Sequence, residues 1–287
     1  MKELLKEKYK IEIDDYYEYK GGIIFFLDGV RYYFVKHNYD DEFFNILIEM
    51  IQELKTKQVY LHEFILDKLG RVNSDGYCLM KIIIFGDEIT EKEMQRFYAI
   101  RNFNEEFYKQ YVSLIELWYK KLDYLEYQVS ELSNRLIINN SFDFYLGITE
   151  EVLQYLNNFS DVSMKQYLSL AHRSLSSFNV IDFYNPLNII IDIYTRDLGL
   201  YVKNNQDYDY LYQFMQNASH DYAYYYLYAR LILPSDYFKI LEDILLDNQQ
   251  EKELSNYINK YLEYEEYIKC IDEMFGFSLF SWIKKSN

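Results

Sequence analysis

The sequence predicts an α+β fold in which a small antiparallel sheet with one helix precedes a larger, mainly helical part. Two turn pairs, Gly21-Gly22 and Asp28-Gly29, separate short aromatic and β-branched runs, and such pairs are strong signals of β-hairpins. Apolar residues then change to helical spacing, which dominates after Gly86. We therefore expect a β-rich domain over residues 1–86 and a helical domain over residues 87–287.

The first domain is expected to contain three strands, one helix and two further strands. The helix is predicted because apolar residues from Phe43 to Leu54 recur on one face, with Glu49 and Glu53 elsewhere on its surface. The expected strands cover residues 16–20, 23–27, 31–36, 59–66 and 77–85, and the expected helix covers residues 40–54.

The second domain is organised by helical periodicity. Thr90 and Glu93 have the spacing of a capping box, which marks the start of a helix. Further expected elements are a long amphipathic helix from Asn104 to about Arg135, a helix beginning near Thr149, a strand at residues 188–191, and helices from Tyr208 onward, one of which Pro234 ends.

Composition limits the functions that the chain can have. Its formal net charge of -16 and its pI near 4.7 argue against nucleic acid as a partner, because phosphate binding needs a basic face. They argue less strongly against an anionic membrane surface. No apolar run approaches the ~18–20 residues that span a bilayer, and the N-terminus lacks the apolar core of a signal peptide. We therefore expect a globular protein with no membrane span.

Cysteine and tyrosine give weaker indications. Cys78 and Cys270 lie far apart without the spacing of a metal site, so we expect two buried, reduced thiols. The chain contains 34 Tyr and 20 Phe, which leaves two explanations open: an aromatic surface for assembly, or the codon bias of an AT-rich genome.

The motif with most chemical content runs from His172 to Asp192. The catalytic loop of kinases has the pattern H-R-D-x-x-x-x-N, in which the Asp accepts the substrate hydroxyl proton and the Asn binds magnesium. Here Ser174 stands at the position of that Asp, while His172, Arg173 and Asn179 keep their places. A serine hydroxyl is neutral at pH 7 and cannot act unaided as a general base. The motif therefore predicts a kinase shape without ordinary kinase activity.

The strand order, this loop and several longer segments together resemble the spore-coat proteins of the CotS type, in particular the YutH branch, within the aminoglycoside and choline kinase superfamily. The segments that carry the resemblance are residues 141–156, His172-Arg173, residues 195–198 and residues 228–238. The resemblance implies a bilobal, protein-kinase-like fold with a small antiparallel N-lobe and a large helical C-lobe. It also implies residence in the mother-cell cytoplasm and then in the spore coat.

The resemblance assigns a role to several residues. Lys36 would reach nucleotide phosphates and pair with Glu49, or with Glu53 one turn later. Asn179 and Asp192 would be the magnesium ligands, and Asp197 would anchor the loop backbone.

Structural explanations stay open for most of these residues. Lys36 could be a solvated lysine at the end of a strand, and His172 could be a hydrogen-bonded anchor of the loop. Asn179 and Asp192 could cap backbone groups instead of binding metal. Arg173 and Arg196 could hold carboxylates such as Asp192 or Asp197.

The leading hypothesis is a pseudokinase, a spore-coat structural protein that docks other coat proteins and has no cofactor, with Mg-ATP expected only if binding is retained. The first alternative is an atypical ATP-dependent phosphotransferase that acts on a small molecule or a coat protein, in which Asp192 works with a displaced acid such as Asp182 or Asp197. The second alternative is a switch that binds ATP without hydrolysing it.

Overall fold

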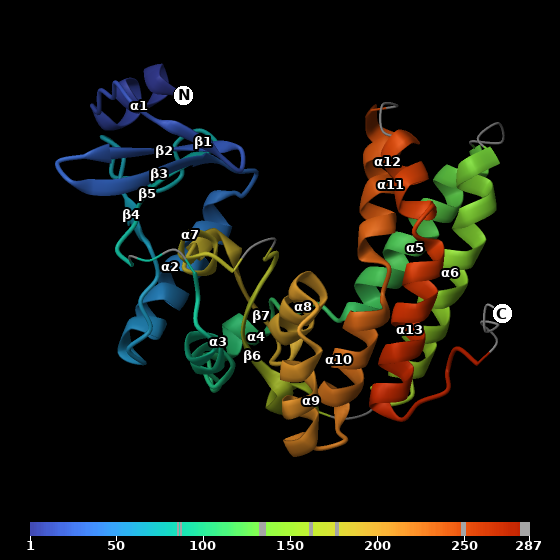
Figure 1. The fold of residues 1–287 in the computed structure, drawn as a ribbon. Helices are drawn as coiled ribbons and strands as arrows, with labels where there is room; N and C mark the ends of the chain where they lie inside the picture. The colour runs from blue at the N-terminus through green and yellow to red at the C-terminus, as the bar shows by residue number, and fades with distance from the viewer. Residues whose placement is uncertain are drawn as a thin grey trace. The chain divides into compact units, whose positions relative to one another are not determined.

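The computed structural model describes residues 1–84, 86, 88–131, 136–160, 163–175, 178–247 and 251–281 (Figure 1). The chain divides into two compact units. The first contains residues 1–110 and 169–191, and the second contains residues 111–168 and 192–287. The domain boundary expected between residues 86 and 87 stays a prediction.

The first unit is built on a five-stranded antiparallel sheet with the order β1-β2-β3-β5-β4. Its central pair, β2 and β3, places Gly22 opposite Val35 and Leu27 opposite Val30. The strands are β1 (Tyr17–Tyr19), β2 (Gly22–Leu27), β3 (Val30–Lys36), β4 (Glu63–Ile65) and β5 (Tyr77–Lys81).

The Asp28-Gly29 turn is confirmed, whereas the first hairpin turns one residue earlier than predicted, at Lys20-Gly21, because Gly22 begins β2. Each turn has left-handed backbone at its two central residues. Lys20 and Gly21 have φ of 40° and 75°, and Asp28 and Gly29 have φ of 50° and 76°. These are the positive φ values that a tight two-residue turn between twisted strands requires. Gly22 is needed for a different reason: a Cβ there would lie 2.5 Å from the carbonyl oxygen of Phe34.

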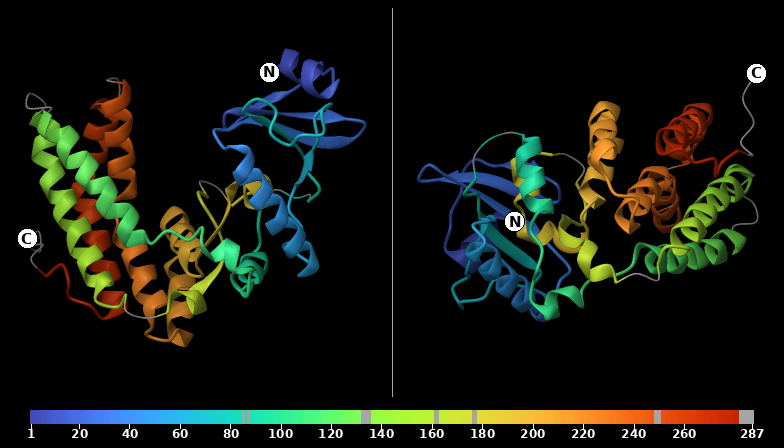
Figure 2. Two further views of the ribbon diagram at one scale, coloured as in Figure 1. Left: turned by 180° about the vertical axis from the view of Figure 1, so that it is seen from behind. Right: turned by 90° about the horizontal axis from the view of Figure 1, so that it is seen from below.

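Two helices cover opposite faces of this sheet (Figures 1 and 2). Helix α1 (Lys2–Tyr9) places Leu5 on the face that carries Phe25 and Phe34. Helix α2 (Asp41–Thr56) packs Phe44 and Leu47 on the other face. Because side chains alternate along a strand, one face of β3 carries Tyr32 and Phe34, and the other carries Tyr33 and Val35.

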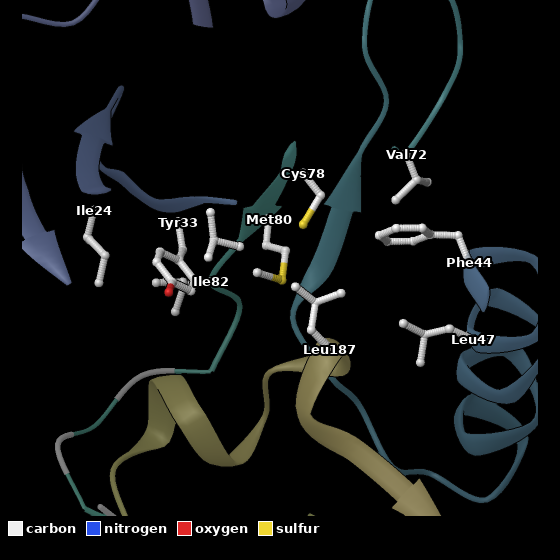
Figure 3. Packing of buried hydrophobic residues seen from close by; sticks show 10 residues of the cluster. Ile24, Tyr33, Phe44, Leu47, Val72, Cys78, Met80, Ile82 and Leu187 are labelled. Carbon is white, nitrogen blue, oxygen red and sulfur yellow. The ribbon is translucent and has the colours of Figure 1, made fainter. Parts of the chain in front are cut away.

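The segment after the predicted catalytic loop completes the core on the α2 side. It contains α7 (Val180–Phe183) and the 3-10 turn η2 (Pro186–Asn188). Figure 3 shows Leu187 of η2 among Met80, Cys78 and Ile82 from the sheet side of the cluster. The backbone N–H of His62 donates to the carbonyl oxygen of Tyr184 at 2.9 Å. The loop region therefore folds as part of the N-terminal unit.

The second unit is almost wholly helical. Helix α10 (Tyr222–Ile232) is buried along most of its length and packs against α6 (Leu136–Asn157), α8 (Arg196–Asn205) and α13 (Tyr261–Phe275). Helix α5 (Leu114–Glu131) packs against α6, and the remaining helices of this unit are α9 (Tyr208–Asn217), α11 (Ser235–Asp247) and α12 (Glu251–Ile258). No helix in the described ranges is long and apolar enough to cross a membrane.

The α+β fold class predicted from the sequence is confirmed, with several local corrections. The Thr90 capping box forms and opens α3 (Glu91–Tyr98). The long helix expected from Asn104 is instead two helices, α4 (Glu105–Tyr108) and α5, and the expected end near Arg135 lies outside the described residues. Thr149 does not start a helix but lies inside α6, where its hydroxyl donates to the carbonyl oxygen of Tyr145.

Two further elements complete the description. Strand β7 (Ile189–Ile193) forms where a strand was expected, and it pairs with β6 (Leu168–His172). Of the two cysteines, Cys78 is buried as expected, whereas Cys270 is exposed.

Candidate functional site

The loop that follows β6 begins at a buried histidine. His172 is fully buried, and its Nε2 donates to the carbonyl oxygen of Phe183 at 2.7 Å. Its ring stacks on Phe97 with centroids 5.4 Å apart. These contacts tie the start of the loop to α7 and to α3, so His172 acts as an anchor of the loop.

Ser174, at the position of the missing base, is held by its backbone. Its N–H donates to Oδ1 of Asn188 at 2.9 Å, and Nδ2 of Asn188 donates back to its carbonyl oxygen at 2.6 Å. The residue is exposed. Arg173 is also exposed, its N–H donates to the carbonyl oxygen of Asn188, and its guanidinium lies 5.2 Å from the centroid of the Tyr39 ring. The loop is therefore fixed in place, but it offers a neutral hydroxyl where kinases have a carboxylate.

Asn179 uses both ends of its amide inside the protein. Its Oδ1 accepts the N–H of Asp182 at 2.9 Å, which caps the start of α7. Its Nδ2 donates to the hydroxyl of Tyr19 at 2.7 Å. The sequence left two roles open for Asn179, a metal ligand and a cap of backbone groups. The observed contacts are those of a helix cap.

An ion pair links the β1–β2 turn to the same short helix. Lys20, in the turn, pairs with the carboxylate of Asp182, whose side chain is 8% exposed. The ion pair and the Tyr19–Asn179 hydrogen bond together form what we call the hairpin latch, made of Tyr19, Lys20, Asn179 and Asp182. In kinases the corresponding turn is the flexible flap over the nucleotide phosphates.

Tyr33 supports the latch from below. It is 3% exposed, and its hydroxyl lies 3.3 Å from the carbonyl oxygens of both Tyr19 and Lys20, to which it can donate. Burial, followed by the nearby Asp182 charge, raises the pKa of Tyr33, so its hydroxyl stays protonated. The β1–β2 turn is therefore held by the Tyr33 hydroxyl and by the Lys20–Asp182 ion pair.

Asp192 lies in the second unit and has its own partners there. It is 5% exposed, and Arg196 of α8 forms an ion pair with its Oδ2. The hydroxyl of Tyr226 donates to Oδ1 at 2.9 Å. Burial alone would lower the pKa of Arg196, but the Asp192 carboxylate outweighs it and the pKa is raised. Both carboxylate oxygens are therefore engaged by protein groups.

The lysine and glutamate expected to pair at the nucleotide do not meet. Lys36 and Glu49 are both exposed, and no ion pair joins them in the part of the chain that the structure describes. The strand alternation gives the reason, since Lys36 follows Tyr32 and Phe34 onto the α1 face of the sheet, away from α2. Glu53 pairs instead with Lys57 at 2.7 Å. The nucleotide role of Lys36 and Glu49 stays a prediction, and this geometry does not support it.

Sequence reasoning did not identify Tyr19, Lys20 or Tyr226 as members of the site. Lys20 and Asp182 are separated by 162 positions, and Lys20 belongs to no motif. One local signal was available, because Asn179 and Asp182 have the spacing of a helix cap and its third residue. Among the described residues, no group of three or more His, Cys, Asp or Glu could hold a metal ion.

Two solved structures with a similar fold are phosphotransferases. An aminoglycoside phosphotransferase from Alicyclobacillus acidocaldarius matches with a TM-score of 0.58 at 12% identity, covering 94% of this chain and 95% of that chain. Spectinomycin phosphotransferase APH(9)-Ia, solved with ADP and spectinomycin, matches with a TM-score of 0.58 at 14% identity, covering 96% of both chains. These similarities show a kinase-like fold.

Sequence comparison identifies the family. No curated protein matches the chain. The family described as spore coat putative kinase YutH, however, matches residues 2–273, which is nearly the whole chain. The protein therefore belongs to this family of spore coat proteins with a kinase-like fold.

Proposed function

We propose that the protein is a non-catalytic, kinase-shaped component of the spore coat whose function is to bind other coat proteins. Membership of a spore coat family supports the setting. The absence of phosphotransfer is supported by the chemistry of the loop, where Ser174 replaces the general base. General base catalysis alone contributes about 10²–10⁴-fold to such reactions.

The hairpin latch is the observation that carries this proposal. A phosphotransferase needs the β1–β2 turn free to cover the nucleotide phosphates. Here Lys20 is committed to Asp182, and Tyr19 is committed to Asn179. These contacts hold the turn against α7, and the amide oxygen that would bind a metal already accepts the Asp182 N–H in the helix cap.

The residues proposed for Mg-ATP do not fit that group as they are arranged. The Asp192 carboxylate is neutralised by Arg196 and hydrogen-bonded by Tyr226, whereas magnesium prefers free carboxylate and water oxygens. The α2 face of the sheet is covered by an apolar cluster to which Leu187 of η2 and Ile181 of α7 contribute. We therefore propose no step through a bound nucleotide.

Calorimetric titration of the full-length protein with Mg-ATP and Mg-ADP tests this proposal. The expected result is no saturable heat, together with no transfer of the γ-phosphate of ATP to the protein itself, to coat extract or to spectinomycin. Ser174→Asp should also remain inactive, because the latch is unchanged in that variant. Transfer by the wild type above the rate without protein would overturn the proposal.

A latch-opening variant makes the test sharper. Lys20→Met with Asp182→Leu replaces both charges by apolar groups, so that neither is left buried alone. If this variant binds Mg-ATP and the wild type does not, the latch is what excludes the nucleotide. If both bind equally, the latch does not occupy the phosphate site and the proposal loses its main support.

One observation favours an alternative, an atypical ATP-dependent phosphotransferase. Asp182 supplies a carboxylate next to Asn179, close in the chain to the position that Ser174 leaves without a base. An enzyme that used it would lose turnover in Asp182→Asn and keep it in Ser174→Ala. A nucleotide-responsive switch would instead bind Mg-ATP without turnover in the titration described above.

A further inference from the structure

The loop between β4 and β5 presents two leucines to solvent. Leu66 is 56% exposed and Leu69 is 67% exposed, which is unusual for two large apolar residues within four positions. We call residues 66–71 the leucine knob. It lies beside β4, the edge strand of the sheet.

The leucine knob is rigid because one buried carboxylate organises it. Asp67, whose side chain is 1% exposed, accepts the N–H groups of Leu69 at 2.8 Å and Arg71 at 2.9 Å. It also accepts the Arg71 guanidinium at 3.0 Å and the Ser74 hydroxyl at 3.1 Å. Although burial opposes ionisation, these hydrogen bonds lower the pKa of Asp67 to about 2. A loop held this firmly loses little conformational entropy when its apolar tip docks.

The knob also carries one exposed lysine on a strongly acidic protein. Lys68 lies between the two leucines, whereas the neighbouring Arg71 is paired with Asp67, and Lys8 is paired with Glu7 and Asp75. The whole chain has a formal net charge of -16. The partner that best fits the knob is therefore an apolar pocket with an acidic rim.

The helical unit contains such a pocket. It has a volume of about 410 Å³, and four tyrosines form its walls: Tyr208, Tyr257, Tyr264 and Tyr267. We call it the tyrosine pocket. Its charged lining residues are Asp236, Glu263, Glu266, Lys203 and Lys260, so carboxylates outnumber cations.

Two of the four wall tyrosines already use their hydroxyls within the protein. The hydroxyls of Tyr264 and Tyr267 donate to the carbonyl oxygens of Ile232 and Leu231 at 2.6 and 3.0 Å. Nζ of Lys203 donates to the carbonyl oxygen of Leu233 at 2.6 Å. These three donors cap the C-terminal end of α10 and hold the walls in place. The lining available to a ligand therefore includes the rings of these tyrosines and the exposed side chains of Glu263 and Glu266.

We propose that the leucine knob of one molecule docks in the tyrosine pocket of a second copy of this chain. Leu69 and Leu66 would pack on the tyrosine rings, and Lys68 would face Glu263 and Glu266. This inference deepens the proposed binding function by naming a partner, and it does not depend on the loss of phosphotransfer. Because the contact joins two different surfaces, each copy keeps one free knob or pocket unless the assembly closes into a ring.

Sedimentation velocity of the full-length protein over a range of concentrations tests the proposal without any nucleotide. The wild type should form species larger than a monomer. Leu66→Asp with Leu69→Asp should weaken association at least tenfold, and so should Glu263→Lys with Glu266→Lys. Leu246→Asp, which changes a leucine 80% exposed on α11 outside both surfaces, is the matched control and should associate like the wild type.

Mixing the two defective proteins gives the decisive measurement. The knob variant has an intact pocket and the pocket variant has an intact knob, so the mixture should form a 1:1 complex although neither associates alone. A wild type that is monomeric at all concentrations, or a mixture that does not associate, would overturn the proposal. Loss of binding to anionic vesicles in the knob variant, without any self-association of the wild type, would show that the knob binds lipid instead.

Discussion

Each unit contains an ion pair that involves an aspartate of the kinase-like loop motif, and the two pairs differ in their exposure to water. In the first unit, Lys20 is 41% exposed while its partner Asp182 is 8% exposed. In the second unit, Arg196 is 12% exposed and Asp192 is 7% exposed. Water can replace Asp182 as the partner of Lys20, but either pair leaves a buried carboxylate when its cation is removed. The first pair is therefore hydrated on its lysine side, whereas the second is enclosed on both sides.

Arg196→Met tests the buried side of this comparison and should have the largest effect. It leaves the Asp192 carboxylate buried, which should lower the free energy of unfolding by about 3–5 kcal/mol. Urea denaturation followed by circular dichroism measures the change. Arg196→Met combined with Asp192→Leu removes both charges and should recover most of the loss. A double variant as unstable as the single one would show that packing, and not charge, is responsible.

Acidification should weaken the first unit selectively through a buried histidine. His62 is 1% exposed, and burial lowers its pKa from 6.5 to about 4. Between these values the unfolded chain binds a proton that the native state does not, so stability is present above pH 6.5 and falls towards pH 4. The loss should reach about 3 kcal/mol.

Thermal denaturation from pH 7 to pH 4 measures the slope of stability against pH. His62→Phe should remove most of it, and His220→Gln, which changes an exposed histidine, should leave it unchanged. An unchanged slope in His62→Phe would show that other groups cause the acid sensitivity.

Asn179→Ala should have an intermediate effect. The variant loses the α7 cap and the hydrogen bond to Tyr19, which together should lower the free energy of unfolding by about 1–2 kcal/mol. Asn179→Ser keeps a cap oxygen and should recover part of the loss. No change in either variant would mean that the contacts of Asn179 do not stabilise the unit.

Lys20→Met combined with Asp182→Leu should have the smallest effect, below about 1 kcal/mol, because it removes an ion pair that water reaches and leaves no buried charge. In the wild type, the contribution of the Lys20–Asp182 pair to stability should also fall in high salt, because water reaches the lysine. A loss as large as that of Arg196→Met would remove the distinction between the two pairs.

Local signals predicted most of the sheet and several helix ends. The turn pairs located both hairpins, the first one residue too late, because glycine adopts positive φ more easily than other residues. Thr90 and Glu93 located α3 because the cap is formed within four residues. Helix α1 was missed because only Leu5 is buried in it, so its pattern is weak.

The contacts of the site were harder to predict because they join distant positions. The loop motif grouped His172, Ser174 and Asn179, but it did not indicate what Asn179 would bind. That answer depends on Tyr19, 160 positions earlier. The expected pair of Lys36 and Glu49 depended on which face of the sheet Lys36 occupies, and only the register of β3 against its neighbours decides that.

The two thiols of the protein have very different access to solvent. Cys78 is fully buried in the sheet core, and burial raises its pKa, so it cannot form a reactive thiolate. Cys270 is exposed and lines the tyrosine pocket. A maleimide dye should therefore attach at Cys270 of the native protein without mutagenesis, and its emission would report directly when that cavity is filled.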